Sequence, residues 1–295
     1  MRDSANSIKP IKAAIIDLYN GETNQGIRCV KDILNELDVK YRSVPIEYEL
    51  FDTRVNNDVP DTGYDLYISS GGPGSPFEGE GSQWEKNYFN LLDSITSHNA
   101  STAEEKKHIF FICHSFQLMA RYYKFAEVTA RNRKSFGIVE VNTTDAGKAD
   151  PIFSKLPDPF YGADFRSWQV VQPKQNVLDE LGASILAIEK ERPHVPFERA
   201  VMAVRISPEI LGTQFHPEAD PASMYYHFRQ PERKQQVVDE YGEEKYFQMI
   251  SILDNPDTLL LTRKTVISGF LGNAIETLRP EQIESNVNHL TMPLA

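Results

Sequence analysis

The sequence predicts an α/β fold, in which helices flank an open, mostly parallel sheet and a helical extension follows at the C-terminus. Short apolar runs of strand length alternate with segments whose apolar residues recur at helical spacing, and a loop follows each run. From residue 221 onward the pattern becomes helical. We therefore divide the chain into residues 1–220, which contain the sheet, and residues 221–295, the helical extension.

The first part of the chain alternates strands with helices. AAIID (13–17) is short, continuous and apolar, which is typical of a buried parallel strand, and IRCVKDILNEL (27–37) follows with apolar residues at helical spacing. The same criteria predict a strand over 41–50, a strand over 65–69, a helix over 84–95, a strand over 109–112 and a helix after Cys113.

The middle of the chain is richer in strands, and the end is helical. Two long amphipathic helices are predicted over 233–253 and 258–278, separated by an NPD turn. Their apolar faces must be buried against the sheet, against a second copy of the chain in a homo-oligomer, or as a lid beside a cleft. The predicted strands of the middle part are 135–141, 167–173, 184–190, 200–206 and 209–215.

Composition and charge exclude several classes of protein. The 295 residues include 31 Lys and Arg against 42 Asp and Glu, a net charge of −11, which argues against a nucleic-acid-binding surface. No apolar run approaches the ~18–20 residues that span a bilayer, and the start lacks the apolar core of a signal peptide. Two cysteines, Cys29 and Cys113, cannot form a disulfide framework. We expect a cytoplasmic protein without a nucleic-acid or membrane partner.

Cys113 lies where an apolar strand ends and a helix begins, in HIFFICHSFQLMA (108–120). A free cysteine at such a junction can be a small buried hydrophobe, or a nucleophile held up by a strand-to-helix turn. A nucleophilic thiolate needs an imidazole, and the imidazole needs a carboxylate to orient it. His216 and Glu218 in TQFHPE suit these roles, because residues two apart on an extended segment share one face. Cys29 lies on the inner stripe of its helix, so we expect it to be structural.

The loop over 69–76 contains SGGPGSP and also follows a predicted strand. Ligands of open α/β sheets bind outside the carboxyl ends of the strands, so this loop and Cys113 are expected at one edge. Glycines let backbone amides face a ligand, as an oxyanion hole requires. The chain has neither a GxxxxGK[ST] phosphate loop nor a GxGxxG dinucleotide fingerprint. We expect no cofactor and no metal.

The motifs SGGPGSP, KHIFFICHSFQLMA and GTQFHPE, in this order and spacing, resemble those of the class I glutamine amidotransferases over residues 12–218. The resemblance implies a flavodoxin-like, glutamine amidotransferase-like domain over residues 1–220. It implies an enzyme that hydrolyses the side-chain amide of glutamine through a γ-glutamyl thioester. Any synthetase that receives the ammonia would be a separate subunit.

The resemblance also implies roles for individual residues. Cys113 would be the nucleophile, His216 the general base and then acid, and Glu218 the group that orients the imidazole. The substrate would be bound by the backbone N–H groups of Gly72 and His114, which would form the oxyanion hole, and by Gln117.

The elbow around the cysteine departs from the family's usual G-x-C-x-G, because Phe111 and Ser115 stand where glycines are usual. Ser115 is a small change, whereas the Phe111 ring must point away from the tight turn. We expect His114 to be a half-exposed loop residue, which would touch the substrate or tune the thiolate only as a less favoured alternative.

Other functions stay open at this point. The chain could hydrolyse a γ-glutamyl conjugate instead of glutamine, or it could be a non-catalytic regulatory module that kept the fold. A related family of small stress proteins also has a cysteine elbow, but its partner glutamate lies early in the chain. The late HPE of this sequence favours the amidotransferases over that family.

Overall fold

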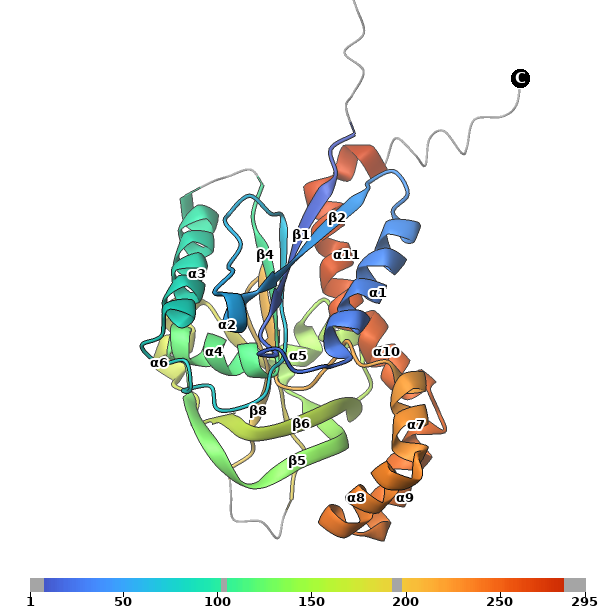
Figure 1. The fold of residues 1–295 in the computed structure, drawn as a ribbon. Helices are drawn as coiled ribbons and strands as arrows, with labels where there is room; N and C mark the ends of the chain where they lie inside the picture. Colours follow the sequence, from blue (N-terminus) through green and yellow to red (C-terminus); the bar gives the residue numbers. More distant parts are fainter. Residues whose placement is uncertain (1–7, 102–104, 193–197, 284–295) are drawn as a thin grey trace, which may run out of the picture.

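The computed structural model describes residues 8–101, 105–192 and 198–283. Within these ranges the chain forms one nine-stranded sheet with the strand order β2–β1–β3–β4–β9–β8–β7–β5–β6 (Figure 1). The strands are β1 (Ile11–Asp17), β2 (Ile46–Asp52), β3 (Leu66–Ser69), β4 (His108–Ile112), β5 (Glu127–Thr143), β6 (Phe160–Val171), β7 (Ser184–Glu189), β8 (Val201–Ser207) and β9 (Ile210–Thr213).

Helices connect the strands and make up the C-terminal part of the described chain. None of them, in the ranges given above, combines the length and the apolar composition needed to cross a membrane. The helices are α1 (Gly26–Lys40), α2 (Thr53–Asn56), α3 (Gln83–Ser101), α4 (His114–Tyr123), α5 (Asp145–Ala149), α6 (Gln175–Leu181), α7 (Pro221–Arg229), α8 (Pro231–Tyr241), α9 (Glu243–Leu253), α10 (Asp257–Thr265) and α11 (Ile267–Leu278), with a short 3₁₀ turn at Phe153–Lys155.

The two halves of the sheet differ in strand direction. β2, β1, β3, β4 and β9 run parallel, whereas antiparallel ladders join β9 to β8, β7, β5 and β6. In the parallel half, Phe111 of β4 is paired with Ser69 of β3 and with Gly212 of β9. The carboxyl ends of these strands therefore meet at one edge, which is where sheets of this kind bind ligands.

Helices cover both faces of the parallel half, and β4 supplies side chains to each of them. Phe110 points to the face that α1 and α11 cover, where it packs with Ile33 and Leu271. Phe111 points to the opposite face, where α3 and α4 pack. Alternation along a strand requires this division. The α/β class and the open sheet flanked by helices are thus confirmed.

Element boundaries differ from the predictions at a few places. The strand predicted over 41–50 begins only at Ile46, because the chain turns after α1, with Val44 N–H donating to Tyr41 O at 2.7 Å. The helix predicted over 233–253 is two helices, because Gly242 adopts a φ of 91° that a helix interior excludes. The helix predicted over 258–278 is likewise split, at Val266 between α10 and α11. Helix α7 was not predicted.

The C-terminal helices pack in two different places. α11 lies on the parallel half of the sheet, where the Phe270 ring contacts Phe110 with ring centroids 5.4 Å apart. α7, α8 and α9 pack instead on the β5–β6 hairpin, in an apolar cluster that includes Phe228, Val237 and Met249 (Figure 1). Both places belong to the one nine-stranded sheet, so the predicted burial against the chain's own sheet applies to α11 on its parallel half and to α7–α9 on β5 and β6. The division of the chain at residue 220 stays a prediction.

We predict that Phe270→Ala destabilises the protein much more than Phe247→Ala. Phe270 of α11 packs on β4 and is 2% exposed, whereas Phe247 of α9 is 52% exposed. The first change leaves a cavity in the core and should cost about 3–5 kcal/mol of unfolding free energy. The second should cost less than about 1 kcal/mol. Denaturant unfolding of both variants measures the difference, and equal losses would contradict the placement of α11 in the core.

A second prediction concerns acid stability and His108. This ring is buried beside Phe270, its Nε2 has no hydrogen-bond partner among the described residues, and burial lowers its pKa to about 4. The folded state thus binds a proton less readily than the unfolded state, whose His pKa is ~6.5, so stability is retained above pH ~6.5 and lost as the pH falls toward 4.

Replacement by a neutral side chain removes this contribution. Between pH 6.5 and 4.5, the unfolding free energy of His108→Gln should fall by about 2 kcal/mol less than that of the parent. Urea unfolding at both pH values measures how the unfolding free energy of each protein changes with pH. Identical slopes for the two proteins would show that His108 is not the buried neutral base we infer.

Candidate active site

Cys113 occupies the turn between β4 and α4 in a strained backbone conformation. Its φ is 48° and its ψ is −96°, and its side chain is 4% exposed. A positive φ is uncommon for a residue with a Cβ and is typical of a nucleophile elbow. Two backbone hydrogen bonds hold the turn: Cys113 N–H donates to Thr213 O at 2.8 Å, and Gln117 N–H donates to Cys113 O at 3.1 Å.

Ser115 adds a side-chain brace to the same turn. Its hydroxyl accepts a hydrogen bond from Ile112 N–H at 2.8 Å and donates to Ser69 O of β3 at 2.7 Å. The residue is fully buried. Ser115 therefore fits the place where the family usually has glycine, and it links the elbow to the end of the neighbouring strand.

Phe111 is accommodated by the strand beside it. The ring is fully buried on the face opposite to the Cys113 side chain, as predicted. Its neighbour in the sheet is Gly212, and a Cβ on Gly212 would lie 2.6 Å from Met119 Sδ, 2.7 Å from Phe116 Cδ2 and 3.3 Å from Phe111 Cβ. The missing side chain at 212 thus provides the space that the Phe111 side of the elbow needs.

His216 and Glu218 lie beside the elbow, after β9. The His216 Nδ1 and the Glu218 Oε1 are 2.8 Å apart, and the Glu218 side chain is 2% exposed. The His216 backbone N–H donates to Ala163 O of β6 at 2.8 Å, which fixes the segment. Gly71 leaves room for the ring, because a Cβ there would lie 2.8 Å from His216 Cε1.

The charge state of His216 follows from these neighbours. Burial lowers the pKa of the imidazole, but the Glu218 carboxylate and the neighbouring Cys113 outweigh burial and hold the pKa well above its ordinary value. The raised pKa favours the protonated ring, whose Nδ1 lies toward Glu218. A protonated imidazole is the partner that a reactive thiolate needs.

The glycine-rich loop contributes Gly72 to the same site. A Cβ on Gly72 would lie 2.3 Å from Leu18 O, so only glycine fits between the loop and the end of β1. The buried guanidinium of Arg54 donates to Leu18 O at 3.1 Å and to Pro73 O at 2.8 Å. Arg54 thus ties the loop, just after Gly72, to the end of β1. Sequence reasoning did not identify this residue.

The two predicted oxyanion donors lie on opposite sides of Cys113 in the chain. The Gly72 N–H has no hydrogen-bond acceptor among the described residues, and Gly72 lines the cavity at Cys113. His114 is the first residue of α4, and the first amides of a helix have no partner within the helix. Their role as oxyanion donors stays a prediction.

The side chain of His114 is a correction to the sequence-based prediction. It is 2% exposed rather than half-exposed, because His114 is the first residue of α4 and not part of a loop. Burial, followed by the charges of Arg54 and Arg121, lowers its pKa to about 3. The ring is therefore neutral, so it carries no positive charge that could stabilise a thiolate.

Gln117 is buried next to the elbow, and its role in substrate binding stays a prediction. Its amide N–H₂ donates to Trp168 O at 3.2 Å and to Gln214 Oε1 at 3.3 Å, and it does not line the cavity described below. Gln214 in turn places its amide nitrogen 3.7 Å from Cys113 Sγ. Gln214 is in the TQFHPE motif, two residues before His216, so the alternation that identified Glu218 could also have identified it.

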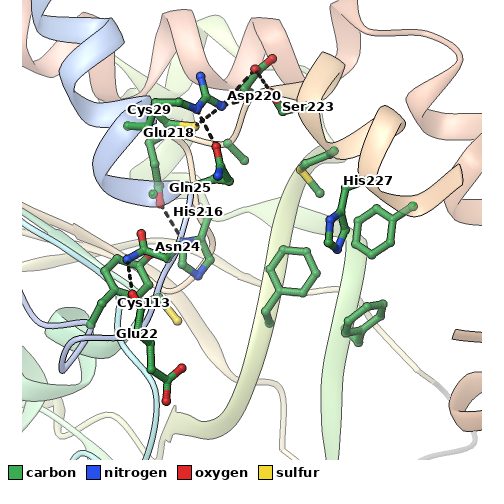
Figure 2. A pocket seen from close by; sticks show the side chains of 18 of the residues that line it. Glu22, Asn24, Gln25, Cys29, Cys113, His216, Glu218, Asp220, Ser223 and His227 are labelled. Atoms are coloured by element: carbon green, nitrogen blue, oxygen red, sulfur yellow. Dashed lines mark hydrogen bonds and ion pairs between the residues drawn. The ribbon is translucent and has the colours of Figure 1, made fainter. Parts of the chain in front are cut away.

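A cavity of about 470 Å³ opens in front of these groups. Figure 2 shows His216 between Cys113 and Glu218, with Glu22 and Asn24 near Cys113 and His227 on the far side. Tyr19, two residues after β1, also lines it; its position at a strand end was a signal that we did not use. In the described ranges no group of three or more His, Cys, Asp or Glu could hold a metal ion.

Comparison with known proteins gives a family and a set of similar folds. The model of the family described as "Glutamine amidotransferase class-I" matches residues 14–229. No curated protein sequence matches the chain. Among solved structures, a glutamine amidotransferase from Thermotoga maritima is similar with a TM-score of 0.59 at 16% identity, covering 94% of this chain and 99% of that one.

Two further structures are similar at comparable identity. A glutamine amido transferase from Methylobacillus flagellatus has a TM-score of 0.55 at 15% identity, covering 87% of this chain and 94% of that chain. The glutaminase domain of Trypanosoma brucei CTPS, with bound acivicin, has a TM-score of 0.51 at 15% identity, covering 70% of this chain and 86% of that chain. At such identities the similarity shows a shared fold. Because the family model spans residues 14–229, the chain belongs to the class I glutamine amidotransferase family.

Proposed function

We propose that this protein hydrolyses a γ-glutamyl amide, such as the side-chain amide of glutamine, through a thioester on Cys113. The observation that carries the proposal is that Cys113 and His216 line one cavity, with His216 Nδ1 2.8 Å from Glu218 Oε1. A thiol, an imidazole and a carboxylate in series form the arrangement of nucleophilic catalysis. An ammonia-consuming synthetase on a separate chain stays a prediction.

The first half of the reaction forms the thioester. The Cys113 Sγ attacks the amide carbon, and the carbonyl oxygen becomes an oxyanion that accepts hydrogen bonds from the N–H groups of Gly72 and His114. The C–N bond then breaks, and the proton on His216 passes to the leaving nitrogen. The products of this half are the γ-glutamyl thioester and a free amine, which is ammonia when the substrate is glutamine.

The second half regenerates the thiol. The now neutral His216 takes a proton from water, and the oxygen of this water attacks the thioester carbon. The C–S bond breaks, the proton taken from water stays on the Cys113–His216 pair, and the new γ-carboxyl group of glutamate loses its own proton to solvent on release. Glu218 keeps its hydrogen bond to Nδ1 throughout, so that the other ring nitrogen faces the reacting atoms.

We predict that a glutamine-like electrophile such as acivicin labels Cys113 and spares Cys29. Both thiols line the cavity, but burial, followed by the charge of Glu218, raises the pKa of Cys29 to about 11, so it stays a thiol at neutral pH. Peptide mass spectrometry should show labelling of the parent and of Cys29→Ser, and no labelling of Cys113→Ser. Labelling of Cys29 in the Cys113→Ser variant would contradict the assignment.

Substitutions at His216 and Glu218 should separate proton transfer from orientation. His216→Ala removes the group that transfers the proton and should lower kcat by about 10³-fold or more. Glu218→Gln keeps a hydrogen-bonding side chain and should lose roughly two orders of magnitude less. Steady-state release of glutamate by the two variants measures these losses. A Glu218→Gln variant as active as the parent would show that Glu218 has no part in the reaction.

A further inference from the structure

The cavity at Cys113 is larger than free glutamine needs, and one of its walls is aromatic. Its volume of about 470 Å³ lies within the ~300–1,000 Å³ typical of sites for much larger ligands. Phe136 of β5, Phe165 of β6 and Phe228 of α7 line it. Ring centroids of Phe165 and Phe228 are 6.2 Å apart, and those of Phe136 and Phe228 are 5.6 Å apart. We call these three rings the aromatic wall.

The aromatic wall begins directly at the imidazole. The Phe165 and His216 ring centroids are 6.1 Å apart. In the proposed reaction, His216 gives its proton to the leaving nitrogen, so this nitrogen must be within hydrogen-bond reach of the ring. Any substituent on the leaving nitrogen therefore lies along the aromatic wall. The nitrogen of glutamine carries no substituent, and ammonia does not need an apolar surface beside the acid.

A cation lines the same cavity as the aromatic wall. Arg233 of α8 lines the cavity, is exposed, and has no ion pair among the described residues; its Nη1 donates to Gln236 Oε1 at 2.9 Å. Burial lowers the pKa of the His227 imidazole, and the nearby charge of Arg233 lowers it further. A carboxylate on the leaving group would find an available guanidinium here.

The side of the site opposite the aromatic wall carries polar side chains. Glu22 and Asn24 lie there, across Cys113 and His216 from His227 (Figure 2). Glu22 offers an anion, which suits the α-ammonium of a glutamyl group. The glutamyl half of a substrate thus belongs on the Glu22 side, and the amine half belongs on the side of the aromatic wall and Arg233.

We propose that the preferred substrate is a γ-glutamyl dipeptide whose second residue is aromatic, and that Phe165 and Arg233 determine this preference. The proposal rests on the proposed function. Water and the amide give glutamate and the free aromatic amino acid; the C–N bond breaks, the proton of His216 goes to the leaving nitrogen, and no other reactant is needed. The aromatic side chain packs on the wall, and its carboxylate pairs with Arg233.

The experiment compares γ-glutamylphenylalanine, γ-glutamylglycine and glutamine at neutral pH, with released glutamate as the readout. The two dipeptides share every polar group and differ only in the benzyl group, so their ratio of kcat/KM isolates the aromatic wall. We expect a ratio of at least about tenfold for the parent, since even one methylene in an apolar pocket gives ~10–200-fold. We also expect γ-glutamylphenylalanine to exceed glutamine by a similar factor.

The variants test the named residues. Phe165→Ala should reduce the dipeptide ratio to less than about one third of its parent value, and Phe165→Leu should restore part of it. Because displacement of His216 would slow both dipeptides equally, the ratio is insensitive to such an effect. Phe247→Ala, an exposed residue of α9 outside the cavity, is the matched control and should leave the ratio unchanged.

Arg233 is tested with a substrate that lacks the second carboxylate. Arg233→Gln should raise KM for γ-glutamylphenylalanine about tenfold and leave KM for γ-glutamylphenethylamide unchanged. Equal rates for the two dipeptides, or faster hydrolysis of glutamine than of both, would overturn this inference while the proposed function stands. If none of the amides is hydrolysed, the proposed function fails, and this inference fails with it.

Discussion

The left-handed backbone of Cys113 is the constraint on which the rest of the site depends. A non-glycine residue in this region costs on the order of 1–3 kcal/mol, so the surrounding structure must hold it. It is held from both neighbouring strands: Thr213 of β9 accepts the Cys113 N–H, and Ser69 of β3 accepts the Ser115 hydroxyl. Only a residue between two parallel strands receives support of this kind, so the elbow and the sheet order are inseparable.

The same constraint explains how the elbow tolerates a phenylalanine. A tight strand-to-helix turn brings α4 close to β4 and β9, which leaves little volume under the helix. Gly212 of β9 leaves that volume free, because a Cβ at this position would collide with Phe116 and Met119 of α4. The requirement for a small residue therefore belongs to the pair of strands rather than to position 111. A motif read along one segment of sequence cannot show this.

Much of the fold could be predicted from the sequence, for a physical reason. Strands buried on both faces, such as β1 and β4, must be short apolar runs, and this pattern is local. The elbow cysteine and the HPE segment were predictable because parallel strands bring their carboxyl ends to one edge. The burial of His114 was not predictable, because it depends on α4 starting without a loop and on Arg54 and Arg121 packing nearby. The break at Gly242 was visible as a glycine, but helical spacing on both sides hid it.

The aromatic wall depends on long-range structure in a way that no local pattern reports. Phe136, Phe165 and Phe228 meet only because β5 pairs with β6 and α7 folds back on the hairpin. β6 also holds the candidate base, since Ala163 O accepts the His216 N–H two residues before Phe165. The strand that positions the imidazole thus also positions the first ring of the wall. A shift of the hairpin would move both together, so the surface that contacts a leaving group stays in register with the group that protonates it.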